Sequence, residues 1–115
     1  MTFDETVFAA LNPIGAAGGV WKSRARDQVT RPYIVFSRIS TVPLNTLAQK
    51  QPSALHIRMQ VDIYSVDAKE ARSLADDVMD ALYASTLKIY LHDDRDIYEP
   101  DVKLYTVKLD FMVWV

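Results

Sequence analysis

The sequence predicts one small α+β domain that spans residues 1–115. The composition, with 50% hydrophobic and 24% charged residues in a chain of 115, is that of an ordinary globular domain with a single core. Side chains in 55–64 and 105–115 alternate with a period of two, which predicts two long, half-buried strands. Residues 67–82 instead carry apolar side chains at intervals of three and four, which predicts an amphipathic helix.

Charge and cysteine content exclude several classes of protein. Thirteen basic and fifteen acidic residues give a net charge of −2, so no global field draws the chain onto nucleic acid or anionic lipid. The chain has no cysteine, which removes disulfide frameworks and thiolate metal sites. Asp4 and Glu5 do not fit a secretory signal, and no apolar run reaches membrane-spanning length. We therefore expect a soluble protein without a membrane anchor.

The N-terminal element is a short helix that Thr2 or Asp4 can cap. The helix should end at Asn12, because the residue before Pro13 is disfavoured in the helical conformation. The stretch 15–19 holds all three glycines and is expected to be a flexible connection into 20–22. It lacks the lysine and hydroxyl residue of a Walker sequence, which argues against a phosphate loop.

The most basic segment follows, with Lys22, Arg24, Arg26 and Arg31 interrupted by Asp27. A solvated loop is the favoured interpretation of such a segment. The alternative is a contact with an acidic partner or a nucleic-acid polymer.

An interior strand is predicted for residues 33–39, which are β-branched or aromatic and apolar on both faces. Residues 41–52 are polar and contain two prolines, so they are expected to form a long excursion between strands. Leu44 and Leu47 in this excursion either tuck under the domain or anchor on another subunit. The next strand, from Leu55, is long enough to project beyond a compact body.

The predicted helix begins with a capping box formed by Asp67 and Glu70. Ala71 and Ala75 lie on its apolar stripe, and their small side chains would let the helix approach a sheet closely. The C-terminal half of the helix contains three aspartates: Asp76, Asp77 and Asp80. The helix dipole disfavours negative charge there, so these residues either lower the stability of the helix by a tolerated amount or form a surface for a partner.

A short strand is expected at 87–91, followed by an acidic stretch, 92–101, with five carboxylates and His92. This spacing lacks the central glycine and terminal glutamate of an EF-hand, so a solvated loop is favoured over a metal site. His56 and His92 have no second ligand at metal-binding spacing and are interpreted as structural.

Catalytic motifs are also missing from the sequence. There is no Gly-x-Ser-x-Gly turn, and the clustered carboxylates lie in a polar setting that would not raise a pKa for acid catalysis. We therefore expect no catalytic residue, no cofactor and no metal, although a site assembled from distant residues stays open.

Beyond these patterns, a set of segments spread over nearly the whole chain carries a family resemblance. They are Arg31-Pro32-Tyr33-Ile34-Val35-Phe36, Arg38-Ile39-Ser40, Leu44-Asn45-Thr46-Leu47, Gln60-Val61-Asp62-Ile63-Tyr64, the helix residues Asp67, Glu70, Ala71, Leu74, Ala75, Val78 and Leu82, then Asp96-Ile97-Tyr98-Glu99-Pro100, Leu104-Tyr105-Thr106-Val107 and Trp114-Val115. In these segments the chain resembles a family of small tailed-phage and prophage proteins that includes the tail-completion and tail-terminator proteins of long, non-contractile tails.

The resemblance implies a mostly antiparallel sheet packed against helices, in a subunit of a homohexameric ring. Such a ring lies in the virion at the head-proximal end of the tail, after synthesis in the cytoplasm of the bacterial host. Its implied partners are the tail-tube protein and a head-completion connector protein, and DNA passes through it without sequence-specific binding. A heterologous interface can close into such a ring.

Two groups of contact residues are hypothesised on this basis. The subunit interface would use Leu44, Asn45, Leu47 and Gln49, whereas DNA-channel or partner contacts would use Lys22, Arg24, Arg26 and Arg31. Another phage neck or tail adaptor, or a small nucleic-acid-binding module, remains an alternative function.

Overall fold

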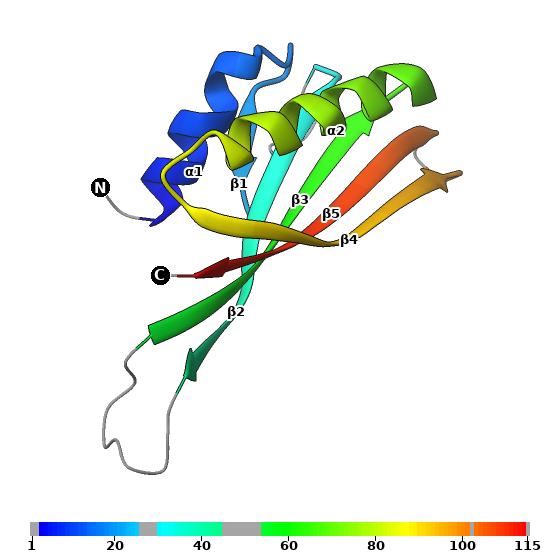
Figure 1. The fold of residues 1–115 in the computed structure, drawn as a ribbon. Helices are drawn as coiled ribbons and strands as arrows, with labels where there is room; N and C mark the ends of the chain where they lie inside the picture. The colour runs from blue at the N-terminus through cyan, green and yellow to red at the C-terminus, as the bar shows by residue number, and fades with distance from the viewer. Residues whose placement is uncertain (1–2, 26–29, 45–53, 102, 115) are drawn as a thin grey trace.

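The computed structural model describes residues 3–25, 30–44, 54–101 and 103–114. Within this part of the chain, five strands form one sheet with the order β1-β2-β3-β5-β4, and two helices accompany it (Figure 1). β1 runs parallel to β2, and every other neighbouring pair is antiparallel. The elements are α1 (Phe3–Leu11), a 3-10 turn η1 (Asn12–Ile14), β1 (Val20–Lys22), β2 (Tyr33–Leu44), β3 (Ala54–Ser65), α2 (Ala68–Tyr83), β4 (Lys88–Glu99) and β5 (Leu104–Trp114). The predicted α+β class is confirmed.

Both helices pack on the same face of the sheet, as Figure 1 shows. Successive side chains of a strand point to opposite faces, so one set of alternate residues in β3 and β5 enters the core. Four from each strand do so and are at most 3% exposed: Ile57, Met59, Val61 and Ile63 in β3, and Val107, Leu109, Phe111 and Val113 in β5. The two alternating patterns in the sequence therefore gave the correct strands and the correct buried faces.

Small residues let α2 lie close to the sheet. Ala71 and Ala75 are fully buried, together with Val78 and Leu82 on the same stripe. Because alanine adds only a methyl group beyond the backbone, the helix approaches the β3 and β5 side chains directly. The predicted apolar stripe is confirmed.

The start of α2 is capped in a way that the capping-box prediction describes only in part. Asp67 Oδ1 accepts a hydrogen bond from the Lys69 amide at 3.0 Å. Glu70, however, reaches back through Ser65, whose hydroxyl donates to Glu70 Oε1 at 2.7 Å and accepts from the Asp67 amide at 3.1 Å. The last residue of β3 thus ties the strand to the helix that follows it.

The N-terminal helix ends at Leu11 and passes into the turn at Asn12–Ile14, as the proline predicts. Asp4 is not its cap, because it lies inside the first helical turn and its carboxylate pairs with the Lys22 ammonium. Thr2, the other predicted cap, lies outside the described residues. Gly15 adopts a φ of 79°, a left-handed conformation that glycine reaches without strain.

Two expected loops belong to strands instead. The acidic stretch from His92 to Glu99 is the second half of β4, which pairs with β5 along its whole length around a bulge between Leu91 and Asp93. Pairing with β5 satisfies the backbone whatever the side-chain polarity, so acidic residues are accepted in this edge strand. Residues 41–44 of the expected excursion likewise extend β2, while residues 45–53 lie outside the described part of the chain.

The far ends of β2 and β3 project from the body as a two-stranded ribbon, visible at the bottom of Figure 1. Among the described residues, the pairing of β5 with β3 reaches His56, whereas the β2–β3 register continues to Leu44 opposite Ala54. The predicted projection of the long strand is confirmed.

Candidate interaction surfaces

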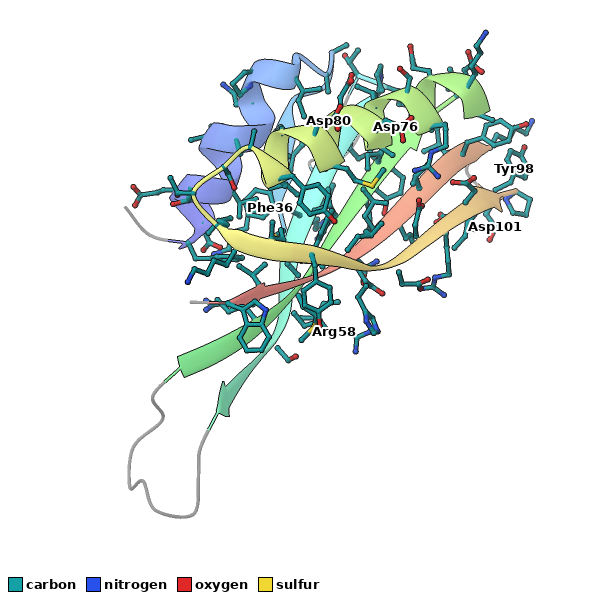
Figure 2. All side chains as sticks on the ribbon, in the orientation of Figure 1. Phe36, Arg58, Asp76, Asp80, Tyr98 and Asp101 are labelled. Carbon is teal, nitrogen blue, oxygen red and sulfur yellow. The ribbon has the colours of Figure 1, made fainter. Side chains whose placement is uncertain are left out.

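The face of the sheet opposite the helices is termed the open face. No helix of the described residues covers it, and its side chains are the alternate set that the core does not use (Figure 2). Cross-strand rows place polar and aromatic side chains side by side on it. Two such rows are Tyr33–Tyr64–Thr106–Ile97 and Val35–Asp62–Lys108–Arg95.

A pair of tyrosines lies where β2 and β3 meet on the open face. The rings of Tyr33 and Tyr64 stack, with centroids 4.9 Å apart and planes at 19°. Burial raises the pKa of both phenols, and the nearby Asp62 carboxylate raises that of Tyr64 further. Both side chains therefore stay neutral, with hydroxyl groups that can donate hydrogen bonds.

Asp62 lies partly buried on this face, within β3. Burial raises its pKa above the ordinary value, although a 2.8 Å hydrogen bond from Gln60 Nε2 to Oδ1 and the positive charge of Lys108 act in the opposite direction. An ionised carboxylate at this position therefore costs stability at neutral pH.

We expect Asp62→Asn to stabilise the subunit at pH 7, because the neutral amide avoids the desolvation penalty that the ionised carboxylate carries. The folded-state pKa of Asp62 lies above the unfolded value, so the aspartate destabilises the fold above the folded pKa and no longer does so below the unfolded pKa. The advantage of the asparagine should therefore disappear near pH 3. Urea denaturation at pH 7 and near pH 3 measures the difference in the free energy of unfolding between the variant and the wild-type protein. Asp77→Asn, at an exposed position of α2, is the control, and a less stable Asp62→Asn variant at pH 7 would contradict the assignment.

The charges of the open face balance one another. Arg58 NH2 lies 3.7 Å from the carboxylate of Asp110, and Arg95 Nε lies 3.1 Å from that of Asp93. Lys108 stands opposite Asp62 in the register of β5 and β3. Among these described residues, three basic side chains thus meet three acidic ones, so this part of the open face has no excess positive charge to attract a phosphate backbone.

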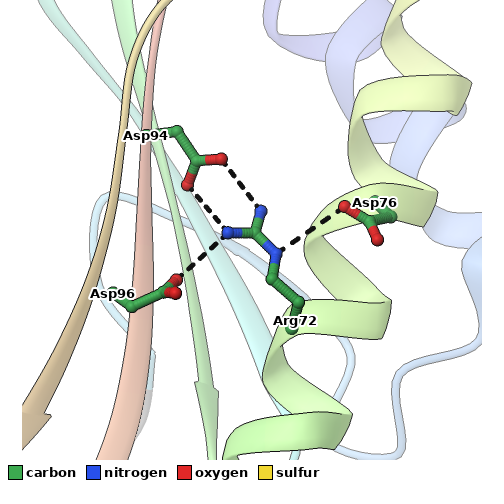
Figure 3. A network of polar contacts seen from close by, with 4 residues as sticks. All are labelled: Arg72, Asp76, Asp94 and Asp96. Atoms are coloured by element: carbon green, nitrogen blue, oxygen red, sulfur yellow. Dashed lines mark hydrogen bonds and ion pairs between the residues drawn. The ribbon is translucent and has the colours of Figure 1, made fainter.

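A second polar network fastens α2 to β4, as drawn in Figure 3. Arg72 makes two hydrogen bonds to Asp94, at 3.0 and 3.1 Å, and a third to Asp96 at 3.1 Å. Asp76, one turn further along the helix, approaches Arg72 Nε at 3.7 Å. The hydrogen bond to Asp94 and the charges of the three acids raise the pKa of Arg72. A bidentate guanidinium–carboxylate pair of this kind fixes orientation as well as charge.

The basic residues singled out in the sequence do not form one cluster. Lys22 ends β1 and its ammonium is engaged by Asp4 of α1. Arg24 is exposed just after β1, and Arg31 is exposed just before β2. Arg26 lies outside the described residues.

The predicted interface residues are placed only in part. Leu44 is the last residue of β2, at the far end of the ribbon. Asn45, Leu47 and Gln49 lie outside the described residues. The contact roles of both groups remain predictions.

Sequence reasoning missed the Arg72 network, although two signals could have indicated it. Asp94 and Asp96 are two residues apart, which places them on one face of a strand, and Arg72 is a lone arginine on the polar side of a helix.

In 3–25, 30–44, 54–101 and 103–114, no group of three or more His, Cys, Asp or Glu side chains is arranged to hold a metal ion. None of the helices described is long and apolar enough to cross a membrane.

The arrangement of layers recurs in a solved virion structure. The chain matches a protein in the "virion of native gene transfer agent (GTA) particle" with a TM-score of 0.75 and 12% sequence identity, over 98% of this chain and 93% of the other. At this identity the likeness establishes a shared α+β fold. No protein of curated function matches the sequence significantly.

The sequence profile of the family "Tail completion protein gp17" matches residues 5–115, which is nearly the whole chain. The chain therefore belongs to the tail completion protein gp17 family, and it is a structural protein of a phage tail. The resemblance found in the sequence is confirmed.

Proposed function

We propose that the protein forms a closed, homohexameric ring that ends the tail tube on its head-proximal side and joins the tail to the head connector. The observation that carries the proposal is membership of the tail completion family across residues 5–115. The shape of the subunit supports it, because a projecting ribbon and two strand edges offer surfaces for repeated head-to-tail contacts.

In this proposal the subunits contact the tail-tube protein on one side of the ring and the head-completion connector on the other, and DNA passes through the centre. The fold shared with a virion protein of a gene transfer agent is consistent with a place in the particle. The balanced charge of the open face favours passage of DNA without tight binding. Arg24 and Arg31, exposed at the β1–β2 side, remain the candidates for channel or partner contacts, together with Lys22 and Arg26.

The mass of the purified protein in solution tests the ring. One subunit has a mass of 13.1 kDa, so a closed hexamer should have a mass of about 79 kDa. Light scattering across a wide range of protein concentrations measures this mass. If the subunit stays at 13.1 kDa at every concentration, even with the tail-tube protein added, the ring proposal is wrong and the adaptor alternative replaces it.

The interface hypothesis makes a separate prediction. Replacing Leu44 and Leu47 together by serine removes apolar side chains proposed to anchor on the neighbouring subunit, so the association constant of each contact should fall about tenfold, equivalent to roughly 1.4 kcal/mol. Circular dichroism should report an unchanged monomer fold. Val66→Ser is the matched control, because Val66 is an exposed apolar residue at the opposite end of β3, between this strand and α2. A ring that survives the double substitution unchanged would remove Leu44 and Leu47 from the interface.

A further inference from the structure

The sheet has two edges that carry unpaired strand backbone within the described residues. β1 covers β2 only opposite Ile34–Phe36, and its last link is the hydrogen bond from the Ser23 amide to the Phe36 carbonyl at 2.7 Å. From Ser37 to Leu44, β2 has β3 on one side and no described strand on the other. β4 forms the opposite edge of the sheet, with β5 as its only described neighbour.

The free edge of β4 is divided at its bulge. Before the bulge, the Leu91 amide donates to the Tyr83 hydroxyl at 2.9 Å, so this backbone group already has a partner from α2. After the bulge, the segment Asp93–Glu99 has no such cover from the described residues. Seven residues of β4 and eight of β2, Ser37–Leu44, therefore have no described strand partner on one side of their backbone.

The directions of these two edges are complementary. β2 to β3, β3 to β5 and β5 to β4 are three successive antiparallel steps, so β4 runs antiparallel to β2. In a ring whose axis runs roughly along the strands, the rotation from one copy to the next keeps their strand directions nearly parallel. The β4 edge of one copy therefore meets the β2 edge of the next in antiparallel orientation, with the geometry of an ordinary antiparallel ladder.

Opposite charges lie on matching faces of the two edges. Arg38 stands opposite Met59 in the register and so lies on the helix side of the sheet, where it is exposed and has no ion-pair partner among the described residues. Asp94 and Asp96 lie on the helix side of β4, as their contacts with Arg72 require. The Asp96 side chain is 66% exposed and receives one hydrogen bond from Arg72, so it retains room for a second cation.

We propose that a second copy of this chain occupies each edge, with residues 93–97 of β4 pairing antiparallel to residues 37–42 of β2 in the next copy and with Asp96 facing that copy's Arg38. The pairing ends there because β1 already occupies the edge of β2 up to Phe36. The inference rests on the proposed ring and adds the contact that closes it: a sheet continuous from subunit to subunit. In this register the β2 bulge at Ile39 brings Ser40 opposite Arg95 on the open face.

The competing interpretation is that the β4 bulge and its acidic side chains protect the edge from pairing, a common device in sheet proteins. The two interpretations differ in how they depend on Arg38. If the acidic side chains keep the edge of β4 unpaired, assembly does not depend on the charge of Arg38. If the edge of β4 pairs with β2 of the next copy, assembly requires the positive charge of Arg38.

Charge exchange separates the two. Arg38→Glu places a negative charge against Asp94 and Asp96 and should lower the assembled fraction about tenfold, and Asp96→Arg alone should do the same by facing Arg38. The double variant Arg38→Glu/Asp96→Arg restores the opposite pair and should recover most of the assembly. Lys69→Glu, an exposed reversal in the first turn of α2, is the matched control and should leave the assembly unchanged. An assembly that tolerates Arg38→Glu, or that the double variant does not recover, overturns the edge contact while leaving the ring proposal intact.

Cross-linking supplies a readout that does not depend on charge. The chain contains no cysteine, so Ser40→Cys/Arg95→Cys introduces only the two proposed neighbours. Under oxidation, the double variant should give a ladder of covalent oligomers in denaturing gels, whereas either single variant should give no species larger than a dimer. Assembly without such a ladder contradicts the proposed pairing, and a wild-type protein that never assembles contradicts the ring and this contact together.

Discussion

Phe111→Ala is expected to lower the free energy of unfolding by about 3–5 kcal/mol, the range for truncation of a buried aromatic side chain. Phe111 lies in the middle of β5, is fully buried, and stands between Met59 of β3 and Leu91 of β4 in the register. Its loss removes apolar contacts and leaves a cavity at the centre of the sheet. Since small domains are stable by only about 5–15 kcal/mol, a large part of the subunit's stability should disappear.

The neighbouring residue on the same strand supplies the control for this prediction. Met112 points to the open face and is half-buried, so Met112→Ala should cost less than about 1.5 kcal/mol, because a partly exposed side chain loses less apolar burial. Urea denaturation followed by circular dichroism measures both variants. Equal effects of the two substitutions would show that the face assignment of β5 is wrong.

Ala75→Leu is expected to destabilise the subunit by about 1–3 kcal/mol through overpacking. Ala75 is fully buried between α2 and the sheet, and three extra carbon atoms require the helix to move away from β3 and β5. Thermal unfolding should show a lower midpoint for this variant. The matched substitution Ser73→Leu, on the exposed side of the same helix, should change stability by less than about 0.5 kcal/mol.

An increase in stability for Ala75→Leu would mean that the helix stands further from the sheet than the fold shows. Because assembly requires folded subunits, both core variants should also lower the amount of ring in proportion to the unfolded fraction. Their ring-forming ability should return at lower temperature, where more of the subunit is folded. This recovery distinguishes them from Arg38→Glu, which leaves the subunit folded and weakens the contact itself.

The elements with strong internal patterns could be predicted from the sequence alone. The strands β3 and β5 and the helix α2 were found from periods of two and 3.6, and their buried faces followed from the same patterns. The start of α2 was predicted from Asp67. The hydrogen bond that the Ser65 hydroxyl donates to Glu70 was not predicted.

The second half of β4 was mistaken for a loop because its side chains are charged. Whether Asp93–Glu99 forms a strand depends on β5, whose backbone pairs with it, and on Arg72, which neutralises Asp94 and Asp96 from α2. Both partners are distant in sequence, so a local pattern could not reveal them. The same reason hid the Arg72 network from the search for functional residues.

By itself, the sequence determined that the segments of β3, α2 and β5 become strand, helix and strand, which of their faces are buried, and the family to which the chain belongs. These properties depend on the spacing of residues within one segment. Only the tertiary structure decided the order β1-β2-β3-β5-β4, and with it the two free edges and the positions of Arg38 and Asp96 on them. Strand order depends on contacts between segments that lie far apart along the chain. Which strand pairs with which is decided by the burial and backbone pairing of several elements together, and no single segment contains that information.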